Sequence, residues 1–379
     1  MVVIIMNKYI KRFLALGMSA TMFLSVFSGC GKGEQLTQET TVAETTTEKE
    51  IVLTDYNRLT GLDDLSDEAK GKRPVAIMIN NIKQSLPQYG IADADLMFEC
   101  EVEGGITRMM AVYADYTKVP AVCSVRSCRY YFPILAHGLD AVYFCFGSNP
   151  TLGTPTLERI KIDYFDGNVN NDSLIFARDP NRVGRYDREH TAFLKGENLP
   201  EIFKKYKTRT DYRDGKDNYI FTFRDEGVIK SAGEKNCDKV NLAFSNKYYS
   251  TFTYDAEKKV YLKQHNGSTH IDSATGEQLS YTNVFALETE VKPYGSTPLV
   301  QIDWKGGTGY YISAGGVKKI KWSKKNEKAG IVIKDMDGKE VKVNAGNSYI
   351  GILNKNTTTL YSEGQAVSFT APVSTTAAN

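Results

Sequence analysis

Residues 96–105, LMFECEVEGG, decide the fold of the N-terminal half of this chain. Their side chains alternate with a period of two, which is the pattern of a β-strand. The apolar residues take one face, and Glu99, Glu101 and Glu103 take the other. Gly104-Gly105 then predicts a two-residue hairpin turn, because glycine adopts positive φ angles without steric cost. We therefore expect a strand over residues 95–103 and an antiparallel return over residues 106–113.

The two-residue turn also predicts the register of this hairpin. Glu103 should lie opposite Ile106 and Glu101 opposite Arg108, so that a guanidinium group stands beside the row of carboxylates. The alternative is a solvated face with a cross-strand ion pair worth less than about 1 kcal/mol.

The segments around this hairpin predict an α/β domain with a mixed sheet over residues 56–215. Residues 75–79, VAIMI, form a continuous apolar run suited to a strand buried on both faces, and a further strand is expected over residues 141–146. Helices are expected near residues 131–137, 155–162 and 200–206.

The C-terminal half predicts a second, β-rich domain over residues 216–356. Alternating or apolar runs cover residues 240–244, 248–254, 260–264 and 284–290, and turn signals such as Asn266-Gly267 separate them. A sandwich or a barrel fits this pattern. Residues 357–379 are rich in Ser, Thr and Ala, and we expect a frayed tail there.

The N-terminus predicts export and lipid anchoring. Residues 1–29 read as a signal peptide, with Lys8, Lys11 and Arg12 before an apolar run over residues 13–27 that is short for a membrane span. Residues 27–30, FSGC, look like a bacterial lipobox, so Cys30 is expected to carry a diacylglyceryl anchor on the outer face of the cytoplasmic membrane. An uncleaved signal anchor is the alternative. Residues 30–55 are rich in Thr and Glu and predict a flexible tether.

The net charge argues against a nucleic-acid partner. A formal net charge of +2 gives no global field that would attract nucleic acid. The membrane, reached through the diacylglyceryl anchor, is the partner that the sequence indicates. Five cysteines remain after Cys30, which excludes a complete disulfide framework. Buried thiols are the favoured interpretation, and a bridge between Cys123 and Cys128 is the alternative. No C-x-x-C spacing occurs and the four histidines lie far apart, so no metal site or cofactor is predicted.

A basic segment supplies the counterpart to the carboxylates. Ser127 could cap a helix whose first turn holds Arg129, so that Arg126, Arg129 and free backbone amides converge on an anion. Pro133 favours a different arrangement, in which the helix begins near the proline and the arginines lie on a loop.

Two apolar strands are followed by polar residues at their carboxyl ends. Open α/β sheets hold their ligands at this end of the strands. Asn80 and Asn81 end the first of them, and Ser148 and Asn149 follow the strand over residues 141–146. The predicted ligand-binding residues are therefore Asn80, Asn81, Glu99, Glu101, Glu103, Arg108, Arg126, Ser127, Arg129, Ser148 and Asn149.

The chain resembles the YerB family of lipoproteins, which consists of an N-terminal and a C-terminal domain of unknown function. The resemblance covers about residues 62–353. Its N-terminal marks are residues 73–81 (RPVAIMINN), residues 102–108 (VEGGITR), residues 125–127 (VRS) and Arg129, and its C-terminal marks are Tyr254-Asp255, Asn266-Gly267, His270, Asp272 and Asn283-Val284.

The chain also departs from the family pattern. Asn80-Asn81-Ile82 stands where the family usually has Asp-Asn-His, and Tyr130-Tyr131-Phe132 replaces Pro-Tyr-Phe. A site built on that acid and imidazole would be impaired. The resemblance implies membrane attachment and a two-domain layout, but no reaction.

Three hypotheses for the function follow. The first is a noncatalytic cell-envelope module that binds an anionic ligand or wall polymer through Arg108, Arg126 and Arg129. The second is a wall-glycan hydrolase that uses strand carboxylates about 7 Å apart. The third is a scaffold for membrane proteins. Phosphate-binding loops of the G-x-x-x-x-G-K type, G-x-S-x-G elbows and H-E-x-x-H motifs do not occur in the sequence, which disfavours the corresponding chemistries.

Overall fold

The computed structural model describes residues 56–170, 172–213 and 220–369, which belong to one compact unit. The predicted signal peptide, Cys30 and the whole of the predicted tether lie outside these residues.

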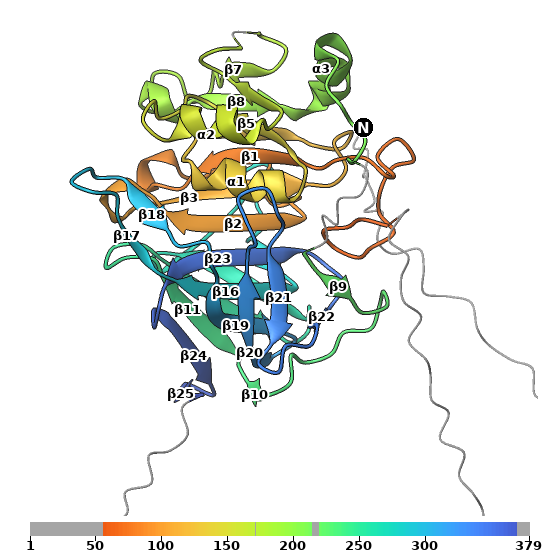
Figure 1. Ribbon diagram of the computed structural model, residues 1–379, viewed down its shortest axis with the longest axis vertical. Helices are drawn as coiled ribbons and strands as arrows, with labels where there is room; N and C mark the ends of the chain where they lie inside the picture. Colours follow the sequence, from red (N-terminus) through yellow and green to blue (C-terminus); the bar gives the residue numbers. More distant parts are fainter. Residues whose placement is uncertain (1–55, 171, 214–219, 370–379) are drawn as a thin grey trace, which may run out of the picture. The chain divides into compact units, whose positions relative to one another are not determined.

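A mixed central sheet organises the described part of the chain (Figure 1). In spatial order its strands are β10 (Lys235–Asn236), β20 (Gly316–Ser323), β19 (Gly307–Ser313), β16 (Asn283–Thr289), β23 (Ser348–Asn354), β2 (Leu96–Glu101), β3 (Thr107–Tyr113), β1 (Val75–Asn80), β5 (Val142–Cys145) and β6 (Tyr164–Asp166). An additional strand, β21 (Val332–Asp335), pairs with β20.

The two halves of the chain share this sheet. β2 pairs with β3 on one side and, in parallel, with β23 from the C-terminal half on the other, and β23 in turn pairs with β16. The predicted mixed sheet in the N-terminal half and the β-rich C-terminal half are both confirmed, and the strands of the two halves are hydrogen-bonded to each other.

Both faces of the central sheet are buried, as the apolar run over residues 75–79 predicts. Met78 and Phe98 belong to the core on one face, and Ile77, Ile79 and Met97 belong to the core on the other. Successive residues of each strand therefore enter different cores, which explains why these strands are apolar throughout.

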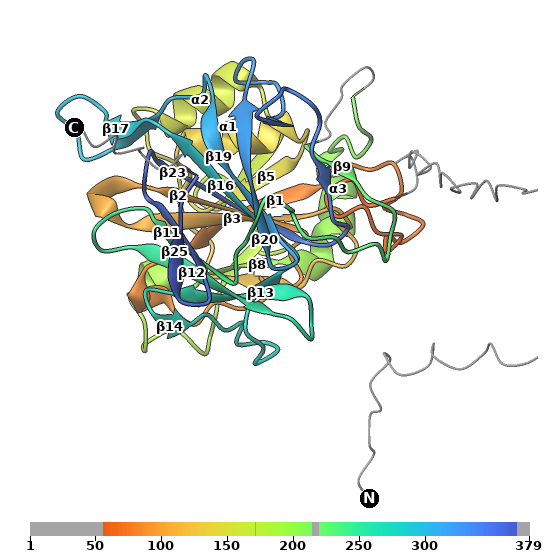
Figure 2. The same cartoon turned by 90° about the horizontal axis from the view of Figure 1, so that it is seen from below.

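A second sheet packs against one face of the C-terminal half and forms a sandwich with it. In spatial order its strands are β14 (Ser268–Thr269), β13 (Val260–His265), β12 (Tyr249–Asp255), β11 (Lys239–Ala243), β24 (Thr358–Ser362) and β25 (Gln365–Val367), and β15 (Ser280–Tyr281) pairs with β13. Figure 2 shows β11, β12 and β13 side by side. The predicted frayed tail is wrong for residues 358–367, because β24 pairs with β11 and buries Leu360.

Shorter elements complete the described fold. The small sheets are β17 (Val291–Pro293) with β18 (Val300–Ile302), β9 (Thr222–Phe223) with β22 (Lys342–Val343), and β4 (Ala121–Cys123) with β8 (Ala192–Lys195) and β7 (Phe176–Arg178). The α-helices are α1 (Tyr131–Gly138), α2 (Gly153–Ile160) and α3 (Leu199–Tyr206), and the 3-10 turns are η1 (Lys83–Ser85), η2 (Glu103–Gly105), η3 (Arg188–His190) and η4 (Gly196–Asn198).

The start of α1 decides between the two predicted arrangements of the arginines. α1 begins at Tyr131, so Arg126, Ser127 and Arg129 lie on the preceding loop, and a helix capped by Ser127 is wrong. Pro133 is the third residue of α1, in the first turn, where a missing N–H costs no hydrogen bond within the helix.

The predicted register of the β2–β3 hairpin is wrong by one residue. Arg108 lies opposite Cys100, and Glu101 lies opposite Thr107. The turn is the 3-10 turn η2, which includes Glu103 itself and holds Gly104 at φ 70°. A shift of one residue moves a side chain to the other face of a sheet, so Arg108 points away from the face of Glu99.

The cysteines confirm the favoured interpretation. Cys100, Cys123, Cys128, Cys145 and Cys237 are all free and buried. Burial raises the pKa of the Cys100 and Cys145 thiols well above the ordinary value, which makes these groups poor nucleophiles.

Candidate functional site

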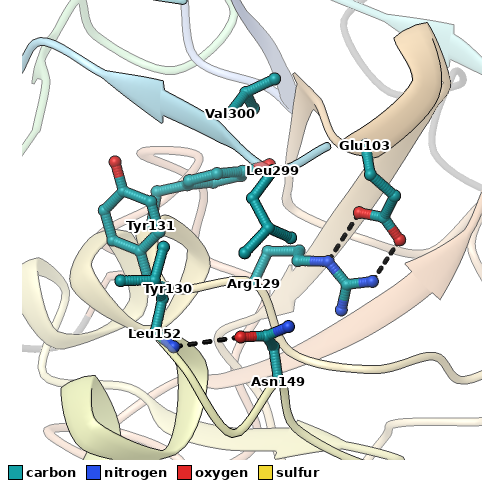
Figure 3. Close-up of a pocket in the computed structure, with 8 residues that line it drawn as sticks. All are labelled: Glu103, Arg129, Tyr130, Tyr131, Asn149, Leu152, Leu299 and Val300. Atoms are coloured by element: carbon teal, nitrogen blue, oxygen red, sulfur yellow. Dashed lines mark hydrogen bonds and ion pairs between the residues drawn. The ribbon is translucent and has the colours of Figure 1, made fainter. Parts of the chain in front are cut away.

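Two arginines from different elements converge on one carboxylate. Glu103, on η2, receives a bidentate contact from Arg129, whose Nε donates to Oε2 at 2.7 Å and whose Nη2 donates to Oε1 (Figure 3). Arg108, at the start of β3, adds a contact from Nη2 to Glu103 Oε1 at 3.2 Å. Two positive charges therefore face one negative charge.

Arg108 is the buried member of this arginine cluster. Arg108 is only 3% exposed. Its Nη1 donates to the carbonyl oxygen of Ser127 at 2.6 Å, whereas its Nε is buried without a hydrogen-bond partner in the described residues. An unpaired donor on a buried cation retains the capacity to bind an oxyanion.

The electrostatics of the cluster keep Glu103 ionised. Burial opposes ionisation, but the hydrogen bonds from Arg129 and the charges of Arg108 and Arg129 outweigh it and lower the pKa of Glu103 to about 2. Burial and the neighbouring charge of Arg129 lower the pKa of Arg108 to about 10. Glu103 and Arg108 therefore carry their charges at neutral pH.

An apolar wall adjoins the cluster, and part of it comes from the C-terminal half. Tyr130, Leu152, Leu299 and Val300 line a small cavity beside Glu103 and Arg129 (Figure 3). The hydroxyl of Tyr130 accepts a hydrogen bond from the backbone N–H of Ile302 at 3.0 Å, which fixes the β17–β18 hairpin over this site. The cavity volume of about 10 Å³ accommodates roughly one water molecule.

The two parallel strand ends do lie together, as expected. β1 pairs in parallel with β5, and the segment after β4 inserts beside both, since Val125 bridges to Ile79 and Cys128 bridges to Ser148. Backbone bonds from Arg126 N to Met78 O and from Phe146 N to Arg126 O hold this loop.

The structure brings some of the predicted residues to the cluster and removes others. The Ser127 carbonyl belongs to it, and Asn149 lines the cavity while its Oδ1 accepts the backbone N–H groups of Thr151 and Leu152, both at 3.0 Å. Ser148 follows β5, and its buried Oγ has no hydrogen-bond partner in the described residues. Arg126 lies on the rim, where it donates to Glu189 Oε1 at 3.0 Å.

Comparison with known proteins places the chain in a family. The description "Protein of unknown function (DUF3048) N-terminal domain" matches residues 59–209, and the corresponding C-terminal domain matches residues 240–350. Together the two matches cover more than half of the chain. The chain belongs to the DUF3048 family. The resemblance stated from the sequence motifs is thereby confirmed.

One curated relative and one solved structure extend this assignment to the DUF3048 fold. YerB of Bacillus subtilis (strain 168), which carries a lipoprotein name, is 26% identical over 312 residues, covering 82% of this chain and 89% of YerB. The crystal structure of the YerB protein from Bacillus subtilis matches with a TM-score of 0.68 at 23% identity, covering 80% of this chain and 99% of that chain. At this identity the structural match shows the fold alone.

The DUF3048 motif at the end of β1 lies in a separate, fully buried polar cluster. Asn81 Nδ2 donates to Glu99 Oε1 at 3.0 Å and to Thr107 Oγ1 at 2.8 Å. Asn80 is also buried, and its Nδ2 is 2.9 Å from His190 Nδ1. Asn80 and Arg108 are backbone partners in the β1–β3 ladder, but the side-chain hydrogen bonds of Asn80 and Asn81 go to residues outside the arginine cluster.

Glu99 is the centre of this second group, which we call the Glu99 cluster. The residues that contact its carboxylate are Asn81, Thr107, Ser250, Lys263 and Tyr349. Gln88 and His270 complete the cluster through contacts to Asn81 and Lys263. Ser250 Oγ and Tyr349 OH donate to Glu99 Oε2 at 3.0 and 2.6 Å. Glu99 is 0% exposed, so the alternative of a solvated carboxylate face is wrong at this position. A glycan could not reach Glu99 in this DUF3048 structure, which argues against a hydrolase that uses this carboxylate.

Several residues of these two sites carry no signal in the sequence. Lys263 and Tyr349 reach Glu99 from strands of the C-terminal half, and Leu299 and Val300 reach the arginine cluster from the β17–β18 hairpin. His270 is indicated only by the resemblance to the YerB family.

The described residues contain neither a membrane-spanning helix nor a metal-binding cluster. No helix among them is long and apolar enough to cross a membrane. Within residues 56–170, 172–213 and 220–369, no group of three or more His, Cys, Asp or Glu side chains is placed to hold a metal ion.

Glu101 predicts a pH-dependent stability. Burial raises the pKa of this half-buried carboxyl from 4.5 to about 7, so its stabilising contribution is complete below pH 4.5 and is lost as the pH rises through 7. Near pH 8, the free energy of unfolding measured in urea should be about 1–3 kcal/mol higher for Glu101→Gln than for the native chain. Near pH 4, the two free energies should be equal. Glu158→Gln, on the exposed side of α2, is the control and should show no such difference. A Glu101→Gln variant that is less stable near pH 8 would contradict the assignment.

Proposed function

We propose that this chain is an exported lipoprotein, anchored through Cys30 on the outer face of the cytoplasmic membrane, whose folded part is a noncatalytic module that binds an anionic ligand. The basic n-region, the FSGC lipobox and the lipoprotein name of YerB support the anchor. Cell fractionation tests it: Cys30→Ala should move the chain out of the membrane fraction, and a chain that stays there would exclude a lipid anchor at this cysteine.

The arrangement of Arg108 and Arg129 around Glu103 supports anion binding. The bidentate contact to Glu103 shows that the Arg129 guanidinium is positioned to hold a planar oxyanion, and Arg108 adds a second, desolvated cation beside it. Glu103 sits on a glycine-containing turn, so it can leave the arginines when another carboxylate or phosphate takes its place.

This exchange predicts opposite effects of two substitutions on affinity. Arg129→Ala removes two charge-assisted hydrogen bonds and should raise the Kd for an anionic wall polymer by roughly tenfold or more. Glu103→Gln removes the competing internal carboxylate and should lower the Kd. The measurement is calorimetric titration of the full chain in detergent with inorganic phosphate and with purified wall polymer, across a salt series.

Arg159→Ala provides the matched control for lost charge. Arg159 lies at an exposed position on α2 and pairs with Glu327. Loss of the Arg159 side chain should therefore leave the affinity unchanged. Binding that is indifferent to Arg129, or a complete absence of binding to both probes, would exclude the anion-binding function and favour a scaffold for membrane proteins.

A further inference from the structure

The Glu99 cluster holds an amine, an amide and a carboxylate in one fully buried site. Asn81 Nδ2 donates to Glu99 Oε1 at 3.0 Å, and Lys263 Nζ lies 3.6 Å from Glu99 Oε2. The side chains of Lys263 and Glu99 are both 0% exposed. One carboxylate thus bridges the amide at the end of β1 and the amine on β13, which come from the two halves of the chain.

From this geometry we propose that Lys263 and Asn81 become joined by an intramolecular isopeptide bond, with Glu99 as the group that transfers the proton.

The amide of Asn81 is oriented as an electrophile. Its Nδ2 is directed toward Glu99 and toward Thr107 Oγ1, which lies at 2.8 Å. Its Oδ1 accepts a hydrogen bond from Gln88 Nε2 at 3.3 Å. A donor on the oxygen polarises the carbonyl group, and it is placed to stabilise the negative charge that develops there during attack.

The amine of Lys263 is held as a nucleophile. Its short contact is to His270 Nδ1, at 3.0 Å, whereas the distance of 3.6 Å to Glu99 exceeds that of a charge-assisted hydrogen bond. Gln88 Nε2 donates to Asn80 O at 2.8 Å, so Gln88 Oε1 accepts from His270 Nε2 at 2.8 Å. His270 Nδ1 is then an unprotonated acceptor that faces Nζ.

Burial is the effect that favours the neutral form of Nζ. The charge of Glu99 and the ring faces of Phe252 and Tyr349, whose centroids lie 5.9 and 5.8 Å from Nζ, favour the ammonium ion. Burial outweighs the charge and lowers the pKa of Lys263, which makes the amine available for attack. Attack requires a rotation of the Lys263 side chain that moves Nζ from the carboxylate toward Asn81 Cγ.

The reaction balances without a cofactor. The lone pair of the neutral Nζ attacks Asn81 Cγ and forms the C–N bond, and the oxygen of the tetrahedral intermediate is hydrogen-bonded by Gln88. Glu99 accepts the proton that Nζ loses and delivers it to Nδ2. The Cγ–Nδ2 bond breaks, the carbonyl group reforms and one molecule of ammonia leaves. No atom is oxidised or reduced.

Peptide mapping of the full chain by mass spectrometry tests the bond. We expect a branched tryptic peptide that joins the segment containing Asn81 to the segment containing Lys263, lighter than the two together by one ammonia, and no cleavage after Lys263. Two linear peptides, with cleavage after Lys263, would overturn the proposal. A loss of ammonia from a linear Asn81 peptide would overturn it as well, since this is the mark of a succinimide.

Two matched variants test the role of Glu99, with circular dichroism as the check of folding. Glu99→Gln keeps the size of the side chain but cannot carry the proton, and it should slow formation of the branched peptide by roughly a hundredfold. Thr251→Ala, at the next position of β12, removes a hydrogen bond to Asn241 outside the Glu99 cluster, and it should leave the branched peptide in place. Equal formation in both variants would exclude Glu99 as the proton carrier.

Discussion

Replacing Arg73 with methionine is expected to lower the free energy of unfolding by about 3–5 kcal/mol, because it breaks a buried ion pair and leaves several acceptors without a donor. Arg73 is 2% exposed, and its Nε donates to the carbonyl oxygen of Asp140 at 2.6 Å. Its Nη1 donates to Asp163 Oδ2 at 2.5 Å and to the carbonyl oxygen of Arg209 at 2.8 Å. It thereby ties the start of β1 to the segments before β5 and after α3.

The adjacent residue is a matched control for Arg73. Lys72 pairs with Asp211 at 2.5 Å, but the two side chains are 31% and 72% exposed, so Lys72→Met should cost only about 0–1 kcal/mol. Chemical denaturation of both variants at neutral pH measures the difference. Equal losses in the two variants would show that the buried network around Arg73 adds nothing beyond a surface pair.

Replacing Asp272 with alanine is expected to cost about 2–4 kcal/mol, since its buried carboxylate satisfies four backbone donors. The N–H groups of Gly90, Ile91 and Ala92 donate to it at 3.1, 2.6 and 2.8 Å, and that of Ala274 at 2.8 Å. Without the carboxylate, these amides lose their acceptor at the junction between the two halves.

The control for Asp272 lies in the loop whose amides donate to it. Asp93 is exposed, and partial desolvation together with the charge of Asp272 raises its pKa, so its carboxylate is repelled rather than bound there. Asp93→Ala should change the stability by less than about 0.5 kcal/mol. Thermal unfolding distinguishes the two variants, and hydrogen exchange at Ile91 and Ala92 should rise only in Asp272→Ala.

Local patterns in the sequence were sufficient for the elements of the N-terminal half. The period of two over residues 96–101 and the apolar run over residues 75–79 predicted β2 and β1, and the amphipathic segment near residue 200 predicted α3. These features depend on neighbours along the chain, and a single sequence records them directly.

The remaining features depend on contacts between distant segments. Nothing near Glu99 indicates that Tyr349, 250 residues away, donates to its carboxylate, so the sequence leaves a solvated acidic face open as an alternative. The one-residue error in register arose because Glu103 belongs to the turn, where both arginines hold it. Of the predicted site, Glu103, Arg108 and Arg129 were brought together, whereas Asn81 and Glu99 lie in another cluster.

The pairing of β2 with β23 has a consequence for the folding of the chain during its synthesis. β2 lies in the interior of the central sheet, yet one of its two partners is among the last strands to be synthesised. Until residues 348–354 have emerged, the backbone N–H and C=O groups along one side of β2 stay open to pairing with a foreign strand. A chain of this design must therefore be shielded from its neighbours for almost the whole time of its synthesis, and a chain truncated before residue 348 would remain permanently prone to aggregation.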